Sequence, residues 1–371
     1  MIEPTWKFVK IPLLILVLTL WTSCQDQKQK IQPKAVKVAS KSLLKQEETK
    51  EKQWLSEYSF FEKPLAQLTP RERVYPYDLN SALFSDYAYK KRFIYLPEGT
   101  KIDYKNEGAL NFETGSVIIK NFYYPKDFNT PEKATRLIET RLLIREETGW
   151  KPLNYVWSED QKDAKLNYVG GEVAVQWIDT KQQVKTVQYG IPNLNECKNC
   201  HYKNDQITPI GPTAAQLNKK YSAIKSSQNQ LDRFEELGLI DLPNSHTELP
   251  KLPVWDDPQT GSVTERAKAY LYANCAHCHN VEGSAKNSGL YLTYLEQDDR
   301  KRGVFKPPVA AGKGSGDFEY DIVPGHPEKS ILIYRMKNND PAIRMPEIGR
   351  VIEHTEGIEL IQNYIKSLAV N

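Results

Sequence analysis

Two segments of the chain carry the same five-residue pattern, in which two cysteines stand three positions apart and a histidine follows directly. They are Cys197–His201, with the sequence CKNCH, and Cys275–His279, with the sequence CAHCH. Two thiols at this spacing can each add to one vinyl group of the same porphyrin, and the adjacent imidazole can then bind its iron from one face. The patterns therefore predict two covalently attached haem c groups. The predicted residues are the attachment cysteines Cys197, Cys200, Cys275 and Cys278 and the axial ligands His201 and His279.

Two other kinds of site also use pairs of cysteines. A zinc site would need a second Cys or His pair at finger-like spacing, and pairing the two motifs with each other would leave a redundant histidine in each. A redox-active CxxC pair should open a helix after a strand in a βαβ unit, and no such pattern surrounds either motif. Four of the five cysteines fall in the two motifs, and this repetition favours covalent haem.

The fifth cysteine has a separate explanation. Residues 1–24 have the features of an export signal, with two lysines before an apolar run that is too short to span a bilayer. The run closes with Trp21-Thr22-Ser23-Cys24, which resembles a bacterial lipoprotein signal apart from Trp21, where Leu, Val or Ile is usual. That resemblance implies a lipid on Cys24 and an exported, envelope-anchored protein, periplasmic or associated with the outer membrane. An ordinary cleaved signal is the alternative.

Composition limits the class of protein. The chain has 371 residues, which suggests two or three domains, and its 40% hydrophobic and 26% charged residues are typical of a globular protein. These values exclude a multi-span membrane protein, and a formal net charge of +3 gives no reason to expect a nucleic-acid partner. Residues 25–53 are rich in Lys, Gln and Glu and contain no aromatic residue, so we expect a disordered tether.

From residue 54 to residue 190 the pattern predicts strands. Period-two alternation and short runs of β-branched and aromatic residues are separated by turn signals such as Pro97-Glu98-Gly99. We expect an antiparallel sandwich or barrel, with strands over residues 92–96, 117–124, 137–144, 173–178 and 184–189. The segment contains no histidine or cysteine. Its tyrosines and tryptophans are expected in the core, and the alternatives are a carbohydrate- or partner-binding face or a wall over a haem edge.

The second motif has a helical setting. Ser262 and Glu265 have the spacing of a capping box that opens a helix ending near Ala273, and apolar residues between 358 and 368 follow the spacing of a helix face. Between them lies Met345-Pro346. This order resembles a class I cytochrome c domain, which implies His279 as the proximal ligand and Met345 as the distal one. Met336 is the rival methionine, although we expect it in a core helix.

The first motif has no methionine between it and the second motif. Candidate sixth ligands are His246, His326, His354 or a residue of the β-rich segment, which supplies no histidine. None is assigned, because a lone histidine is more often a hydrogen-bonded residue than a ligand. An open sixth position would let the iron bind peroxide or small gases. Three arginines are candidate partners for haem propionates or else surface charges: Arg335, Arg344 and Arg350.

From Trp54 onward the chain resembles an uncharacterised family of bacterial two-haem c-type cytochromes with a β-rich N-terminal domain. The matching stretches are Tyr75–Asp86, Glu139–Arg141, Tyr155–Trp157, Glu196–Asn218, Ala269–His279, Ile322–Gly325 and Arg344–Pro346. The resemblance implies a multidomain fold in which an all-β N-terminal domain is followed by mainly α cytochrome c-type haem domains. The expected parts are a β-rich domain over 54–190, a first haem segment over 191–255 and a class I cytochrome c-like domain over 256–371.

The family resemblance implies electron transfer, with a redox partner protein in the cell envelope. Met/His-ligated iron suits an electron carrier, since both axial positions are filled. The alternative from the enzyme class is a di-haem peroxidase-like oxidoreductase with an exchangeable site at the first haem. A third hypothesis is a binding module whose β-domain captures a glycan or another ligand.

Overall fold

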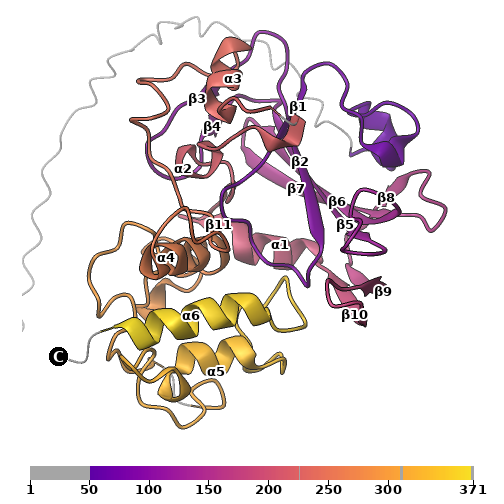
Figure 1. Cartoon of the computed structure of the whole chain (residues 1–371). Helices are drawn as coiled ribbons and strands as arrows, with labels where there is room; N and C mark the ends of the chain where they lie inside the picture. The colour runs from indigo at the N-terminus through magenta and orange to yellow at the C-terminus, as the bar shows by residue number, and fades with distance from the viewer. Residues whose placement is uncertain (1–50, 225, 310–311, 369–371) are drawn as a thin grey trace, which may run out of the picture. The chain divides into compact units, whose positions relative to one another are not determined.

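The computed structural model describes residues 51–224, 226–309 and 312–368 (Figure 1). The predicted export signal, Cys24 and residues 25–50 of the predicted tether lie outside these ranges. From Glu51 onward the chain forms one unit. None of the helices within the described ranges combines the length and apolar character that a membrane span requires.

The largest element is a six-stranded antiparallel sheet with the strand order β1-β2-β5-β6-β7-β8. Its strands are β1 (Val74–Tyr77), β2 (Tyr89–Tyr95), β5 (Val117–Pro125), β6 (Thr135–Glu146), β7 (Gly149–Trp157) and β8 (Ala164–Leu166). Successive side chains of a strand point to opposite faces. Ile118 packs in one apolar cluster and its neighbours Val117 and Ile119 in another, so the sheet is covered on both faces around β5.

Three two-stranded sheets and six α-helices complete the described chain. The small sheets pair β3 (Ile102–Asp103) with β4 (Asn111–Phe112), β9 (Gly171–Ile178) with β10 (Val184–Ile191), and β11 (Tyr202–Lys203) with β12 (Gln206–Ile207). The helices are α1 (Leu194–His201), α2 (Ala214–Leu217), α3 (Gln230–Glu236), α4 (Val263–Asn274), α5 (Ile331–Lys337) and α6 (Thr355–Ser367). Short 3₁₀ turns occur at Leu55–Tyr58, Leu65–Gln67, Ser222–Ile224, Lys286–Ser288 and Pro327–Lys329.

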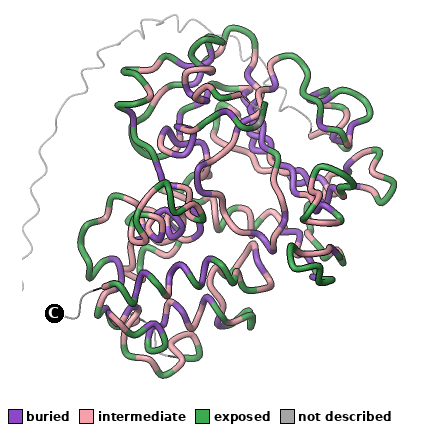
Figure 2. Tube along the Cα trace, viewed as in Figure 1, coloured by how far each residue is buried: buried purple, intermediate pink, exposed green. Residues whose placement is uncertain are grey.

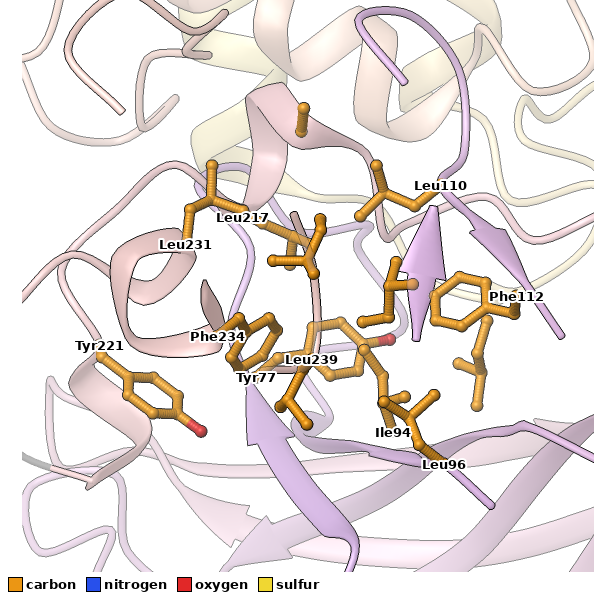
Figure 3. Packing of buried hydrophobic residues seen from close by; sticks show 14 of the residues in the cluster. Tyr77, Ile94, Leu96, Leu110, Phe112, Leu217, Tyr221, Leu231, Phe234 and Leu239 are labelled. Carbon is orange, nitrogen blue, oxygen red and sulfur yellow. The ribbon is translucent and has the colours of Figure 1, made fainter. Parts of the chain in front are cut away.

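One apolar cluster joins the sheet to the segment that follows the first motif. Figure 3 shows Leu217, Leu231 and Phe234, from α2 and α3, packed with Ile94 and Leu96, which belong to β2 and the residue after it. All five side chains are buried. Residues 214–249 therefore share their core with the sheet, and this core fixes the segment that follows the first motif against the sheet.

The C-terminal helices have their own core. Figure 1 shows α4, α5 and α6 grouped together, and α6 contacts both α4 and α5. Buried positions recur along α6 between exposed ones (Figure 2), and Ile361, Tyr364 and Ile365 are nearly inaccessible to solvent. The helix α4 begins with the capping box expected from the sequence, in which Ser262 and Glu265 exchange hydrogen bonds.

A buried polar loop, Asn80–Asp86, ties these parts together. The Asn80 amide donates to the carbonyl oxygens of Ala215 and Asn218. Ser81 exchanges two hydrogen bonds with the Gln216 side chain through its backbone, and its hydroxyl donates to the carbonyl of Pro253. Buried polar groups are costly unless they are paired, so each contact fixes a C-terminal segment relative to the sheet.

The far end of the same loop holds the segments around the second motif. The backbone N–H of Phe84 donates to the side chain of Asn274, the last residue of α4, over 2.8 Å. One carboxylate oxygen of Asp86, which is 1% exposed, accepts the backbone N–H groups of Val351 and Ile352 at 2.8 and 3.0 Å. The loop Asn80–Asp86 therefore acts as a structural clamp.

Replacing Asp86 by alanine should lower the free energy of unfolding by about 2–4 kcal/mol, because two backbone donors lose a charged acceptor. Asp86→Asn retains an acceptor oxygen, and it should lower the free energy of unfolding less. Denaturant unfolding measures both variants, with Asp256→Asn, at an exposed aspartate, as the control. Equal effects for Asp86→Ala and Asp256→Asn would contradict the assignment of Asp86 to the clamp.

Candidate functional site

The first motif forms the C-terminal part of α1. Asn193 caps this helix by accepting the N–H groups of Asn195 and Glu196, and the Glu196 carboxylate accepts the N–H of Asn193 in return. This capping box holds the short helix, whose residues are all at least partly exposed. Cys197 and Cys200 are half-buried free thiols. Burial raises the pKa of the Cys197 thiol.

His201 is held in one tautomer. Its Nδ1 lies 2.7 Å from the carbonyl oxygen of Thr208, and a carbonyl can only accept, so Nδ1 carries the proton. Burial lowers the pKa of His201 to about 4, which keeps the ring neutral near pH 7. The lone pair of Nε2 is then the metal-binding group, and the Thr208 carbonyl orients the ring as partners of metal-ligating histidines commonly do.

The second motif begins where α4 ends, with Cys275 as the C-cap residue. Burial raises the pKa of Cys275 to about 12. The Nδ1 atom of His279 lies 3.2 Å from the hydroxyl oxygen of Ser288, and that hydroxyl donates its own hydrogen to the carbonyl of Ala285. Ser288 must therefore accept from His279, so Nδ1 is again protonated and Nε2 again has the lone pair.

The two motifs are in contact with each other. The Cys278 sulfur lies 3.9 Å from the carbonyl oxygen of Asn199, and a hydrogen bond with the Cys278 thiol raises the pKa of Cys200. Beyond the motifs, the Lys203 ammonium lies 2.7 Å from the Glu282 carboxylate. Two motifs that are far apart along the chain are thus brought together, and one thiol from each lies at the contact. Within the described ranges, no group of three or more His, Cys, Asp or Glu side chains is arranged to hold a metal ion.

A cavity of about 1410 Å³ opens beside the first motif. Its lining includes Cys197, Cys200 and His201 from α1, and His277 from within the second motif. Strands β2, β5 and β6 contribute Arg92, Lys120 and Arg141 to the same lining. Ligand pockets typically measure about 300–1,000 Å³, so a porphyrin-sized group fits this space. The donor set of two thiols, an imidazole Nε2 and nearby cations for acidic groups also suits haem.

The three histidines named as candidate sixth ligands have other partners. His246 lies 2.7 Å from the Asp232 carboxylate and His326 lies 3.0 Å from the Glu328 carboxylate. His354 stacks on Phe84 and its Nδ1 lies 3.0 Å from the hydroxyl of Tyr270. Each of these imidazole rings therefore has a partner within the chain that accounts for its position without a bound metal.

His277 is the histidine that sequence reasoning overlooked. It stands between the cysteines of the second motif, where the pattern allows any residue, so nothing in the spacing singles it out. In the structure it lines the cavity together with His201, and its buried Nδ1 has no hydrogen-bond partner among the described residues. No other histidine lines this cavity within the described chain. Only the fold reveals the proximity.

Met345 and Met336 occupy different environments. Met336 is buried in the core of the C-terminal helices, which explains it by packing. Met345 is half-buried, and its backbone is fixed by Arg335 and Arg350. The guanidinium of Arg350 donates six hydrogen bonds to Asn339 and to the backbone of Arg335, Asn338, Met345 and Ile352. Arg350 therefore positions the Met345 loop, and its five N–H groups are all engaged within the chain.

Several tyrosines and tryptophans of the β-rich segment lie in the core, as expected for the segment. Tyr77, Tyr155, Trp157 and Trp177 are buried, whereas half-buried Trp150 packs edge-on against Phe112 and lines the cavity.

Comparison of the chain with known protein families, with curated proteins and with solved structures finds no significant match. The assignment of a function therefore depends on the motifs and on their surroundings in the fold.

The environment of His354 gives a pH dependence. Burial lowers the pKa of His354 to about 4 from 6.5. Between these values the unfolded chain binds a proton that the folded chain does not, so the free energy of unfolding falls as the pH drops from 6.5 to 4. The loss amounts to about 3 kcal/mol in total.

His354→Phe retains the stacking on Phe84 and should remove the part of this pH dependence that His354 contributes, measured by denaturant unfolding at half-unit steps of pH. His326→Phe, at an exposed histidine, is the matched control and should leave the slope as in the parent protein. If His354→Phe had the parent's slope, His354 would not be the group responsible.

Proposed function

We propose that the protein is a di-haem c-type cytochrome that carries electrons in the bacterial cell envelope. The contact between the two Cys-x-x-Cys-His motifs, with one thiol from each at the junction, is the observation that carries the proposal. When bound, haem supplies an iron that exchanges single electrons. Cys197, Cys200, Cys275 and Cys278 would hold two such groups, and neighbouring attachment points favour transfer between them.

The residues around each imidazole support the same function. The Thr208 carbonyl and the Ser288 hydroxyl accept from Nδ1 of His201 and His279 and so leave Nε2 of each ring for iron. Arg350 holds the loop that presents Met345, the proposed sixth ligand of the second group. His277 is our candidate for the sixth position of the first, because it lines the cavity with His201. Filled axial positions suit electron transfer.

The proposed setting is the cell envelope. A lipid on Cys24 would anchor the protein to a membrane, and residues 25–53 would serve as the tether between that anchor and the folded chain. Attachment of haem through thioethers takes place after export, which agrees with the signal-like N-terminus. The partner would be a redox protein of the same compartment, and no nucleic acid is involved.

A di-haem peroxidase-like oxidoreductase is the second candidate. The cavity of about 1410 Å³ is larger than the usual range for a single small ligand, so it has room for a substrate next to a bound group. This function requires an exchangeable axial position at the first motif. The two candidates therefore differ in whether an added ligand can reach the iron.

The first test is the mass of the denatured protein, made in a host that attaches haem. We expect two covalent haem groups in the parent protein. Cys197→Ser with Cys200→Ser should remove one, and Cys275→Ser with Cys278→Ser should remove the other, because each pair of thioethers holds its own group. A polypeptide whose mass contains no haem would refute the proposal.

Carbon monoxide binding to the reduced protein separates the two functions. An electron carrier should show no change in its Soret band, because both irons keep two protein ligands. Met345→Ala should then open one iron to carbon monoxide, and His277→Ala should open the other while leaving the Cys-x-x-Cys-His spacing intact.

Met336→Leu is the control and should bind no carbon monoxide. Binding by the parent protein at one iron would favour the peroxidase-like function. If His277→Ala had the same spectrum as the parent in the presence and absence of carbon monoxide, His277 would be excluded as the sixth ligand.

A further inference from the structure

Three cations stand directly opposite one another across the sheet. In the strand register Arg92 of β2 pairs with Lys120 of β5, and Lys120 pairs with Arg141 of β6. We call these three residues the cation row. Since neighbouring strands lie about 4.8 Å apart, the row is roughly 10 Å long. Like charges placed directly opposite on adjacent strands destabilise a sheet, so the arrangement requires an explanation.

The row is withdrawn from solvent and has few partners. Arg92 is 7% exposed, and Lys120 and Arg141 are half-buried. Of these three residues, only Arg141 has an ion pair within the described ranges, with the fully buried Glu139. Glu139 also accepts a hydrogen bond from the Tyr189 hydroxyl. The Nε–H group of Arg141 is buried without a partner. The ring of Phe122 lies 4.8 Å from the Lys120 ammonium and 4.3 Å from the Arg141 guanidinium, which compensates only part of the charge.

The row faces the space beside the first motif. All three residues line the cavity that also contains Cys197, Cys200 and His201. The next position across the sheet is Asn154 of β7, which pairs with Arg141. The Asn154 amide donates to the carbonyl of Pro192, two residues before α1. One end of the cation row therefore lies close to the start of α1, the helix that contains the first motif, and the row extends across the sheet from there.

Buried cations are stable when an anion neutralises them, and guanidinium groups match the planar geometry of carboxylates. We propose that Arg92, Lys120 and Arg141 form a carboxylate-binding row, and that its ligands are the propionate groups of the haem attached to the first motif. This inference rests on the proposed function. It assigns a role in the cofactor site to the β-rich segment, which supplies no thiol or imidazole.

The test compares Arg92→Gln and Lys120→Gln in the full-length holoprotein. Each should shift the midpoint potential of one haem to more negative values, because a cation beside the propionates favours the reduced iron, and should leave the other midpoint unchanged. Lys91→Gln is the matched control. It makes the same charge change at the exposed neighbour of Arg92 on β2, on the opposite face of the sheet, and should move neither midpoint.

A second measurement covers variants that perturb folding. In protein that lacks the first haem through Cys197→Ser and Cys200→Ser, Lys120→Gln should raise the unfolding temperature, because it relieves like-charge repulsion. In the holoprotein the same substitution should lower the unfolding temperature. The same sign in both backgrounds would overturn the proposal and leave Lys120 as an ordinary structural residue.

Free succinate distinguishes the two sources of a carboxylate. With propionates in the row, added succinate should change neither the spectrum nor the midpoints of the parent protein. A saturable response that Arg92→Gln abolishes would assign the row to a free anion and overturn the propionate assignment. The denatured mass is measured first: a missing haem refutes the proposed function together with the row, whereas attached haem with unmoved midpoints refutes the row alone.

Discussion

The requirement that buried polar groups find partners organises this molecule around the loop Asn80–Asp86. Asn80 and Ser81 are almost inaccessible to solvent, and they are satisfied by groups from residues 215–218 and 253–255. Asp86 is satisfied by the backbone of Val351 and Ile352. Apolar packing between the sheet and the helices is non-directional, whereas these hydrogen bonds form only when the segments have the correct distance and orientation. The clamp therefore supplies the specificity with which two distant Cys-x-x-Cys-His motifs meet.

The same clamp reaches the motifs through their own helices. Phe84 binds Asn274, the residue directly before Cys275, and the core under α2 and α3 anchors the chain that follows His201. Neither motif is held in place by a buried face of its own helix where the two motifs meet. The helix α1 has no buried residue, and Cys275 follows the last turn of α4. Their proximity is consequently a property of the whole described unit, and damage to the clamp should reach both motifs.

Local patterns made much of this predictable, and long-range pairing accounts for the rest. The capping box at Ser262 and the apolar spacing of residues 358–365 locate α4 and α6, and β5 and β6 contain the strands expected from runs of β-branched residues. The strand β7 was not among the predicted strands, because Lys151, Pro152 and Asn154 interrupt its apolar pattern. The position of His277 and the alignment of Arg92 with Lys120 depend on packing and register, which no local signal in a single sequence specifies.

The cation row shows how the β-rich segment can matter to redox chemistry without supplying a ligand to iron. A sheet holds side chains of adjacent strands at a fixed spacing, so three basic side chains stay together. Burial and the neighbouring cations Arg92 and Arg141 hold the pKa of Lys120 well below its usual range. Cross-strand repulsion lowers stability until an anion occupies the cavity, and binding of that anion then recovers the loss. Under the proposed function, the cost of assembling Arg92, Lys120 and Arg141 is offset when the group at the first motif is in place. The sheet would thereby couple the stability of the fold to the loading of its cofactor.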